Sequence, residues 1–541
     1  MTGGEAMVRA AAANGTDPIF GQPGAQIYPL VDAIYRHPDI REVISRHEQG
    51  AGYMAYGYAK ATGRPGVFSV VPGPGILNAG AALCTADGCN QPVVCLTGQV
   101  MSEFLGKGRG HLHELRDQPA TLRTIIKHAD RIDDPTRTSE QVNDAFRQAL
   151  GGRPGPASVE MCWDTMAATH EIDIEAGVKD IERPEPDADA VADAARLVAG
   201  AKNIMIMCGG GAQHADKEVR QLAEMLGASV TAFRSGRGIV AEDHACGTSS
   251  AAARLLWEDT DLLIGIGSRL ELQFMRWGSM EKYYDAPPDG SPKVIRIDID
   301  PMEMNRVTPD VGIVADSVDG TNALIAAIGK TGFSAGDLER IADAKARARS
   351  NIEEIQPQIS YLDTIRAVLP RDGYFVEELC QVGFASNYGF PVYEPRTYVS
   401  TGYQGTLGFG FPTAIGVKSG MPDRAVVSII GDGGFLFGMP ELASAVQQDI
   451  GVITVVFNNS SYGNVRRDQQ LRFDNRIIGA DLENPDMVKL AESFGADGYR
   501  VDSPESLGPV LARAIDNDRP AVIDVTIERG SETSPWKYIH G

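Results

Sequence analysis

The sequence predicts an α/β protein made of three doubly wound domains, in which helices cover both faces of a parallel sheet. Short apolar runs rich in β-branched residues, typical of strands buried on both faces, recur along the chain and lead into glycine turns and helices. At 541 residues the chain is too long for a single core. We expect domains at 1–165, 186–330 and 356–541.

In the first predicted domain, one strand leads into a glycine turn and the next leads into a helix of small residues. The first strand, at 18–20, runs into the turn Gly-Gln-Pro-Gly at 21–24. The second ends near Ser45 and places Glu48 at the start of the helix, where small side chains allow close packing. A carboxylate at this position can serve catalysis or simply stabilise the helix dipole, and Glu48 alone does not decide between the two.

A charged, glycine-rich loop at 106–114 follows a further strand of this domain, at 92–99. It contains His111 and His113, which are either active-site groups or solvated loop residues. The domain closes with a strand at 157–161. The acidic segment that follows lacks an apolar rhythm, which indicates a linker.

The second predicted domain begins with a buried strand at 204–208 that runs into three glycines at 209–211. Further buried runs at 261–266 and 294–299 predict a smaller doubly wound domain. A glycine turn alone is weak support for nucleotide binding. A charged, alanine-rich helix at 336–355 is expected to connect this domain to the third.

The stretch 426–459 of the third predicted domain carries the clearest sign of a ligand site. A buried strand at 426–430, a glycine turn, a helix whose first turn is expected at Pro440, and a second buried strand follow one another. Because the carboxyl ends of parallel strands share one edge of a sheet, Asp432 and Asn459 are expected to meet there. Two oxygen donors beside glycines outline a Mg²⁺–diphosphate site. An ordinary βαβ unit with turn-capping side chains is the alternative.

These motifs resemble those of thiamine-diphosphate-dependent enzymes, and most closely those of acetolactate synthase and its relatives. The resemblance rests on the runs Gln22-Pro23-Gly24-Ala25, Arg46-His47-Glu48-Gln49-Gly50-Ala51 and Pro72-Gly73-Pro74-Gly75-Ile76-Leu77-Asn78, and on the Asp432 and Asn459 pair. It implies a pyrimidine-binding, a central and a diphosphate-binding domain, in that order, over nearly the whole chain. It also implies that Glu48 hydrogen-bonds the aminopyrimidine ring of the cofactor and starts the proton relay that activates it.

The resemblance implies further site residues and an assembly. Asp432, Asn459 and the backbone carbonyl of Ser461 would bind Mg²⁺. Leu407 would hold the cofactor rings in a bent arrangement, a position that a core leucine also explains, and Val465 would lie near the reacting carbon. The other implied cofactor contacts are Pro23, Gly24, Pro72, Asn78, Gly405, Gly431, Gly433, Gly434, Tyr462 and Gly463. In the family, Glu48 and the diphosphate domain that share a cofactor come from different subunits, so a homodimer or homotetramer is expected.

Three departures from acetolactate synthase bear on the reaction. The loop triplet Phe-Gln-Glu of that enzyme is Leu112-His113-Glu114 here, which makes His113 a candidate acid–base group. Asp468 stands where a tryptophan usually helps to select the second 2-oxoacid. In the middle domain only Arg269 remains of a run that holds a flavin, so FAD, another nucleotide and no ligand all stay open.

Composition narrows the class of protein. A net charge of −22 disfavours nucleic acid or an anionic membrane as a partner. Seven cysteines without a Cys-x-x-Cys pair argue against a disulfide framework or a zinc site. No run reaches membrane-spanning length and the amino terminus lacks a secretory pattern, so the cytoplasm is the simplest expectation.

We therefore expect a C–C lyase or carboligase that depends on thiamine diphosphate and Mg²⁺ and is similar to acetolactate synthase. Its substrate would be a small 2-oxoacid or an acyl-CoA-type compound. The changed loop residues at 112–113 and the Asp468 in place of tryptophan leave a 2-oxoacid decarboxylase or a 2-hydroxyacyl-CoA lyase as alternatives. An oxidoreductase that uses a flavin or nicotinamide bound to the middle domain is a hypothesis from a different class.

Overall fold

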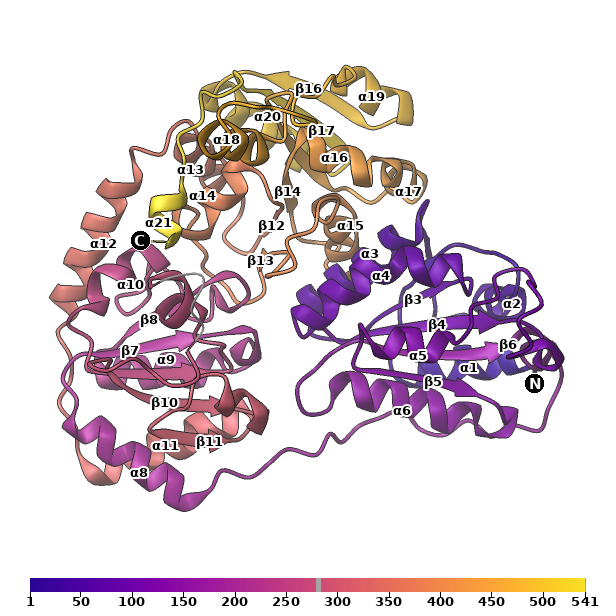
Figure 1. Ribbon diagram of the computed structural model, residues 1–541, viewed down its shortest axis with the longest axis horizontal. Coiled ribbons are helices and arrows are strands. Elements are labelled where there is room, and N and C mark those ends of the chain that lie inside the picture. The colour runs from indigo at the N-terminus through magenta and orange to yellow at the C-terminus, as the bar shows by residue number, and fades with distance from the viewer. Residues whose placement is uncertain (279–283, 541) are drawn as a thin grey trace.

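The computed structural model describes residues 1–278 and 284–540 and contains three α/β domains, each built around a parallel sheet (Figure 1). The predicted fold class is therefore confirmed. Residues 170–187 contain no helix or strand, as expected of a linker, and run from the first domain to the second. Helix α12 (Leu338–Ile352) connects the second domain to the third, where a helix was expected.

The N-terminal sheet has the strand order β2-β1-β3-β4-β6-β5, and all of its strands are parallel. Every residue of β3 and β4 is buried, because helices cover both faces of the sheet. The strands are β1 (Ile19–Gly21), β2 (Glu42–Ile44), β3 (Gly66–Val70), β4 (Val93–Gln99), β5 (His128–Ile132) and β6 (Ala157–Cys162). The helices are α1 (Gly3–Ala13), α2 (Tyr28–Arg36), α3 (Glu48–Thr62), α4 (Pro74–Gly88), α5 (Gln118–Arg123), α6 (Thr138–Leu150) and α7 (Trp163–Ala167).

The central domain is smaller, with the parallel strand order β11-β10-β9-β7-β8. The strands are β7 (Ile204–Cys208), β8 (Ser229–Ala232), β9 (Leu262–Ile266), β10 (Lys293–Asp298) and β11 (Val311–Val314). The helices are α8 (Ala188–Gly200), α9 (Asp216–Leu226), α10 (Ser250–Trp257) and α11 (Ser317–Thr331).

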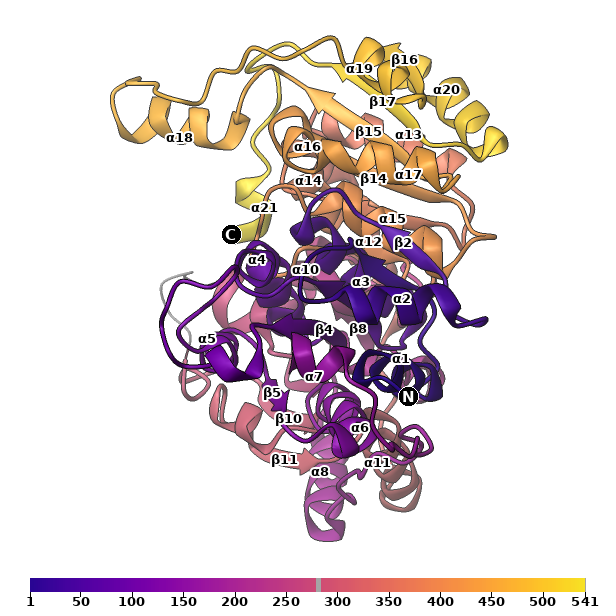
Figure 2. The same cartoon turned by 90° about the vertical axis from the view of Figure 1, so that its right-hand side faces the viewer.

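The C-terminal sheet has the order β13-β12-β14-β15-β17-β16, again with all strands parallel. The strands are β12 (Tyr374–Glu377), β13 (Tyr398–Val399), β14 (Val426–Gly431), β15 (Ile453–Asn458), β16 (Asp497–Val501) and β17 (Ala521–Thr526). The helices are α13 (Gln358–Val368), α14 (Gln381–Gly389), α15 (Gly410–Gly420), α16 (Asp432–Gly438), α17 (Leu442–Gln447), α18 (Gly463–Arg472), α19 (Met487–Phe494), α20 (Pro504–Asn517) and α21 (Trp536–His540). Helix α18 projects away from the body of the domain (Figure 2) and has no buried residue.

Helices α3 and α15 join the N-terminal and C-terminal domains along a line of small residues. A Cβ at Gly57 would lie 2.1 Å from the carbonyl oxygen of Thr413, and a Cβ at Gly416 would lie 1.9 Å from that of Met54. The two backbones are therefore in contact, and one hydrophobic core continues from the first domain into the third.

The helix of the predicted ligand stretch begins earlier than expected. It was predicted to start at Pro440, but α16 already starts at Asp432, and Pro440 lies in a short 3₁₀ turn between α16 and α17. Gly433 and Gly434 are thus helical residues. Neither position has room for a side chain. A Cβ at Gly433 would lie 2.4 Å from the Tyr462 ring, and a Cβ at Gly434 would lie 2.0 Å from the Glu378 carboxylate.

Two expectations from composition can be compared with the structure. All seven cysteines are free thiols in the structure. In the part of the chain that the structure describes, the helices are too short or too polar to span a bilayer.

Candidate active site

A pocket of about 230 Å³ lies at the carboxyl ends of β14 and β15. Parallel pairing sets Gly431 opposite Phe457, so Asp432 and Asn459 leave the sheet at the same edge. The predicted residues that line it are Leu407, Gly431, Asp432, Gly433, Gly434, Asn459, Ser461, Tyr462, Gly463 and Val465. Gly405 is close by, since a Cβ there would lie 3.1 Å from Leu379, which lines the pocket.

Hydrogen bonds hold the two predicted metal ligands in place. Asp432 is 2% exposed and accepts a hydrogen bond from Asn484 Nδ2 at 2.6 Å. The Oδ1 atom of Asn459 accepts from the backbone N–H of Ser461 at 3.1 Å and from its hydroxyl at 2.8 Å. Asn459 Nδ2 donates to Glu532 at 2.7 Å. All three predicted ligands, Asp432, Asn459 and Ser461, line the same pocket.

The pocket is electrostatically suited to a cation. Burial raises the pKa of both Asp432 and Glu532, and the charge of Asp432 raises that of Glu532 further. Within the described residues neither carboxylate lies within 4.0 Å of a basic side chain. The described part of the chain contains no cluster of three His, Cys, Asp or Glu side chains suited to a metal. A cation in this pocket therefore also needs amide, hydroxyl, backbone or cofactor oxygens. Such hard oxygen donors fit Mg²⁺.

One further polar group faces the pocket without a partner. Gln381 begins α14, lines the pocket and is 7% exposed, and its Oε1 has no hydrogen-bond partner among the described residues. Buried polar atoms are rarely left unpaired, so this amide fits a polar ligand. The residues present therefore agree with a diphosphate group and its metal.

The predicted residues of the N-terminal domain gather at a second place. Glu48 is 9% exposed and accepts a hydrogen bond from Asn78 Nδ2 at 3.0 Å. A Cβ at Gly75 would lie 3.6 Å from Glu48 Oε1 and 2.8 Å from Val71, and a Cβ at Gly24 would lie 2.4 Å from Val71. Pro72 is buried in the same turn, whereas Pro23 and Asn78 are exposed at its rim.

His113 belongs to this second group. Its Nδ1 lies 2.7 Å from Gln26 Oε1, and its backbone lies so close to Gly73 that a Cβ there would be 2.4 Å from the His113 carbonyl oxygen. Glu114 instead holds the loop together by accepting hydrogen bonds from the N–H groups of Gly108, Gly110 and His111. His111 stacks on Phe104.

The chain keeps these two groups of residues apart. Among the described residues, none before Leu379 lines the pocket of the C-terminal domain. Instead, the residues just before α3 contact the 3₁₀ turn that follows α16, where the N–H groups of Arg46 and His47 donate to Glu441. We refer to the group around Glu48 as the N-terminal half-site and to the group around Asp432 as the C-terminal half-site.

Comparison with known proteins gives a match for each of the three domains. Models of the N-terminal TPP binding domain, the central domain and the C-terminal TPP binding domain of thiamine pyrophosphate enzymes match residues 1–121, 191–324 and 380–525. The chain belongs to the thiamine pyrophosphate enzyme family. Thiamine pyrophosphate is another name for thiamine diphosphate.

The relatives narrow the type of enzyme. A probable acetolactate synthase large subunit of Methanocaldococcus jannaschii is 33% identical, over 98% of this chain and 92% of the relative. The acetolactate synthase large subunit of Corynebacterium glutamicum is 32% identical, over 100% and 88%. A probable 2-ketoarginine decarboxylase of Pseudomonas aeruginosa is 33% identical, over 92% and 88%. This thiamine pyrophosphate enzyme is thus similar to acetolactate synthase and is a carboligase or a decarboxylase.

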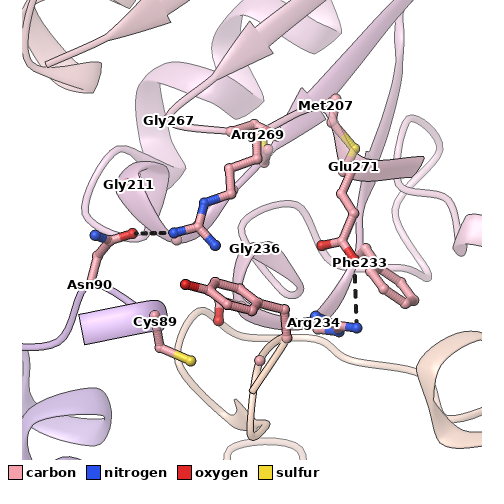
Figure 3. A pocket seen from close by; sticks show the side chains of 18 residues that line it. Cys89, Asn90, Met207, Gly211, Phe233, Arg234, Gly236, Gly267, Arg269 and Glu271 are labelled. Atoms are coloured by element: carbon pink, nitrogen blue, oxygen red, sulfur yellow. Dashed lines mark hydrogen bonds and ion pairs between the residues drawn. The ribbon is translucent and has the colours of Figure 1, made fainter. Parts of the chain in front are cut away.

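In this family member a further cavity, of about 400 Å³, lies between the N-terminal and central domains, next to a smaller pocket at the junction of all three domains. Figure 3 shows the smaller pocket, with Asn90 of the N-terminal domain facing Arg269 and Glu271 facing Arg234. The glycine turn after β7 lies against the turn that follows β9, since a Cβ at Gly209 would be 2.0 Å from the carbonyl oxygen of Gly267. Burial raises the pKa of Asp298, at the end of β10, to about 6.

Four residues near the C-terminal half-site were not predicted: Glu378, Gln381, Asn484 and Glu532. Glu378 directly follows β12, and Gln381 starts the next helix, so the strand-end reasoning applied to Asp432 would have found both. Asn484 and Glu532 lie in irregular segments, where no pattern in the sequence announces a contact with Asp432 or Asn459.

Proposed function

We propose that this enzyme uses thiamine diphosphate and Mg²⁺ to break the bond next to the carbonyl carbon of a 2-oxoacid and to pass the remaining fragment to a second carbonyl compound. The observation that carries the proposal is the meeting of Asp432, Asn459 and Ser461 with Leu407 in one pocket. The bound cofactor supplies an electron sink for such a cleavage.

The residues of the chain would then have distinct roles. Asp432, Asn459 and Ser461 would hold Mg²⁺ and, with Gln381, the diphosphate group. Leu407 would support the two rings, Val465 would face the substrate, and Glu48 would exchange a proton with the pyrimidine ring while Asn78 keeps its carboxylate in place.

A 2-oxoacid decarboxylase is the second candidate. His113 favours it, because this titratable side chain lies in the N-terminal half-site, where it can return a proton to a product. The similarity to a probable 2-ketoarginine decarboxylase is in line with it.

An assay with product identification separates these candidates. The protein would be incubated with thiamine diphosphate, Mg²⁺ and a panel of 2-oxoacids and 2-hydroxyacyl-CoA compounds. We expect CO2 and α-hydroxyketone products of ligation from a carboligase, and CO2 and aldehydes from a decarboxylase. Turnover that persists unchanged without thiamine diphosphate would contradict both.

We also propose that Glu48 of one chain completes the C-terminal half-site of a second chain. The two half-sites lie apart in one chain, and apolar side chains are exposed near both. Leu77 and Leu112 are 54% and 62% exposed in the N-terminal domain, and Leu471 and Ile478, on and beyond α18, are 76% and 81% exposed.

Mixed dimers test this arrangement. Glu48→Gln and Asp432→Asn chains would be unfolded, mixed and refolded together, and then assayed at a cofactor concentration at which each variant alone has little activity. A site shared between chains gives mixed dimers with one intact site, so activity returns. A site within one chain leaves every site defective, and no activity returns.

For the central domain we propose a bound nucleotide without a redox role. The glycine turn after β7, the acidic Asp298 and the arginines of the cavity, Arg153, Arg183, Arg269 and Arg396, suit a ribose and its phosphates. Acid release from purified protein, followed by chromatography, would show a nucleotide that has no visible absorption. A flavin spectrum would contradict the proposal.

A further inference from the structure

Glu378 is a carboxylate enclosed between the two segments that form the C-terminal half-site. It follows β12 directly and is 0% exposed. On one side of it lies the turn that carries Leu407, and on the other side lies Gly434 at the bottom of the pocket.

Both oxygens of Glu378 accept backbone hydrogen bonds from the residues that follow Leu407. Oε1 accepts from the N–H of Gly408 at 2.8 Å, and Oε2 accepts from that of Gly410 at 2.5 Å. Gly408 has a φ of +77°, a conformation that glycine adopts easily. The carboxylate therefore fixes the backbone on the carboxyl side of Leu407.

A second contact fixes the other side of this turn. The hydroxyl of Tyr53, on α3, forms a hydrogen bond of 2.7 Å with the hydroxyl of Thr406. Leu407 is thus placed between one anchor from the N-terminal domain and one from β12. Leu407 itself is half-buried and lines the pocket.

Glu378 also contacts the glycines on which a diphosphate would rest. A Cβ at Gly434 would lie 2.0 Å from Glu378 Oε1, so the Gly434 backbone packs directly on this oxygen. A displacement of α16 is therefore transmitted through a single side chain to the Leu407 turn.

The carboxylate has no cationic partner to explain its position. No basic side chain of the described residues forms an ion pair with it, and burial raises the pKa of Glu378 to about 8, against the effect of the Gly410 and Gly408 N–H groups. Burying an acid in this way is costly, and such groups concentrate at functional sites.

Resting on the proposed function, we propose that Glu378 is a positioning residue that couples the diphosphate-binding glycines to Leu407. When the diphosphate group orders Gly433 and Gly434, the contact with Glu378 sets the Leu407 turn, and Leu407 then sets the arrangement of the two rings. Glu378 touches neither substrate nor cofactor in this scheme.

The substitution Glu378→Gln tests the coupling. It keeps the size of the side chain but turns one acceptor oxygen into an amino group that opposes a backbone N–H. We expect the affinity for thiamine diphosphate to change by less than about tenfold, whereas the turnover number falls about 100-fold because the rings are misplaced. The near-UV circular dichroism of the bound cofactor, which reports the ring arrangement, should change as well. Glu378→Asp, which keeps the acceptors but shortens the side chain, should be intermediate.

Glu377→Gln is the matched control. Glu377 is the adjacent residue, is 2% exposed and has a pKa raised to about 7 by burial, but it forms no hydrogen bond with the Leu407 turn. It should leave affinity, turnover and the dichroism signal unchanged. Equal losses in both variants, or wild-type values in Glu378→Gln, would overturn the coupling.

Two further results keep the test decisive. If Glu378→Gln does not fold, Gly408→Ala alters the same hydrogen bond through the backbone, and wild-type dichroism and turnover in that variant would overturn the proposal. If the wild type binds thiamine diphosphate but turns over no substrate, the proposed function fails. The dichroism of Glu378→Gln then decides the role of Glu378 by itself.

Discussion

The N-terminal and C-terminal domains contain parallel sheets with the same strand order, yet the two sheet edges carry different chemistry. If the strands of each sheet are numbered along the chain, both follow the order 2-1-3-4-6-5. The third strand leads to Pro72-Gly73-Pro74-Gly75 in one domain and to Asp432-Gly433-Gly434 in the other. The second strand leads to Glu48 and α3 in one, and to Leu407 and α15 in the other.

Equivalent positions in the two sheets thus carry different parts of the candidate site. The fold supplies an edge where loops meet, and in the proposed function the side chains on these loops would let one edge move protons and the other bind a metal and phosphates. The equivalent helices α3 and α15 also pack directly on each other. Substitutions at equivalent places in the two domains should therefore have different effects.

The largest expected effect is on turnover, from Glu48→Gln. We expect the turnover number to fall by about 10²–10⁴, because the amide cannot exchange the proton. The affinity for thiamine diphosphate, measured by calorimetry, should change far less. Glu42→Gln, on β2 of the same domain, is the control and should keep turnover.

Asp432→Asn should affect the affinity for the cofactor more than the turnover number. Loss of a charged metal ligand should weaken the binding of thiamine diphosphate and Mg²⁺ by at least about tenfold. Titration of the cofactor at fixed Mg²⁺, and of Mg²⁺ at fixed cofactor, measures both. Asp474→Asn, at a side chain that is 86% exposed, should change neither. Wild-type affinities in Asp432→Asn would contradict the proposal that the C-terminal domain binds the metal and the diphosphate while the N-terminal domain exchanges the proton.

The next prediction concerns the contact between α3 and α15. Gly57→Ala places a methyl group 2.1 Å from the carbonyl oxygen of Thr413 and should lower the free energy of unfolding by about 1–3 kcal/mol. Gly329→Ala, in α11, has nothing within 4 Å and should instead raise it by about 0.5–1 kcal/mol. Thermal unfolding followed by circular dichroism distinguishes the two. A stabilised Gly57→Ala would contradict the close approach.

The last prediction concerns buried acids and pH. Burial raises the pKa of Glu377 from 4.5 to about 7, and that of Glu160 to about 7 as well. The folded chain then keeps protons that the unfolded chain releases, so stability is lost as the pH rises from about 4.5 to 7. Relative to wild type, Glu377→Gln should gain up to about 1.4 kcal/mol per pH unit across this range.

Glu160→Gln provides the contrast from the other domain. Glu160 accepts hydrogen bonds from the side-chain amides of Gln99 at 3.2 Å and Gln118 at 2.6 Å. In Glu160→Gln, the new NH₂ group would face one of these amide donors. Glu377 Oε2, in contrast, has no hydrogen-bond partner in the described residues. At pH 5, Glu160→Gln should melt below wild type and Glu377→Gln should not. Equal melting temperatures would contradict this difference.

The sequence was sufficient for the features that depend on local pattern. The buried strands, the three sheets and the shared edge of Asp432 and Asn459 follow from apolar runs and parallel topology. The early start of α16 did not follow, because Gly433 and Gly434 are poor helix formers whose small size is required by Tyr462 and Glu378. Contacts from irregular segments, such as Glu532 to Asn459, depend on tertiary packing alone.

The glycine contact between α3 and α15 also affects how the chain is made. Helix α3 ends at Thr62, but its partner surface begins only at Gly410. At about 5–20 residues per second, tens of seconds of synthesis separate the two helices. During that time the small-residue face of α3 emerges without its partner, so the nascent N-terminal domain is open to association with other chains until α15 leaves the ribosome.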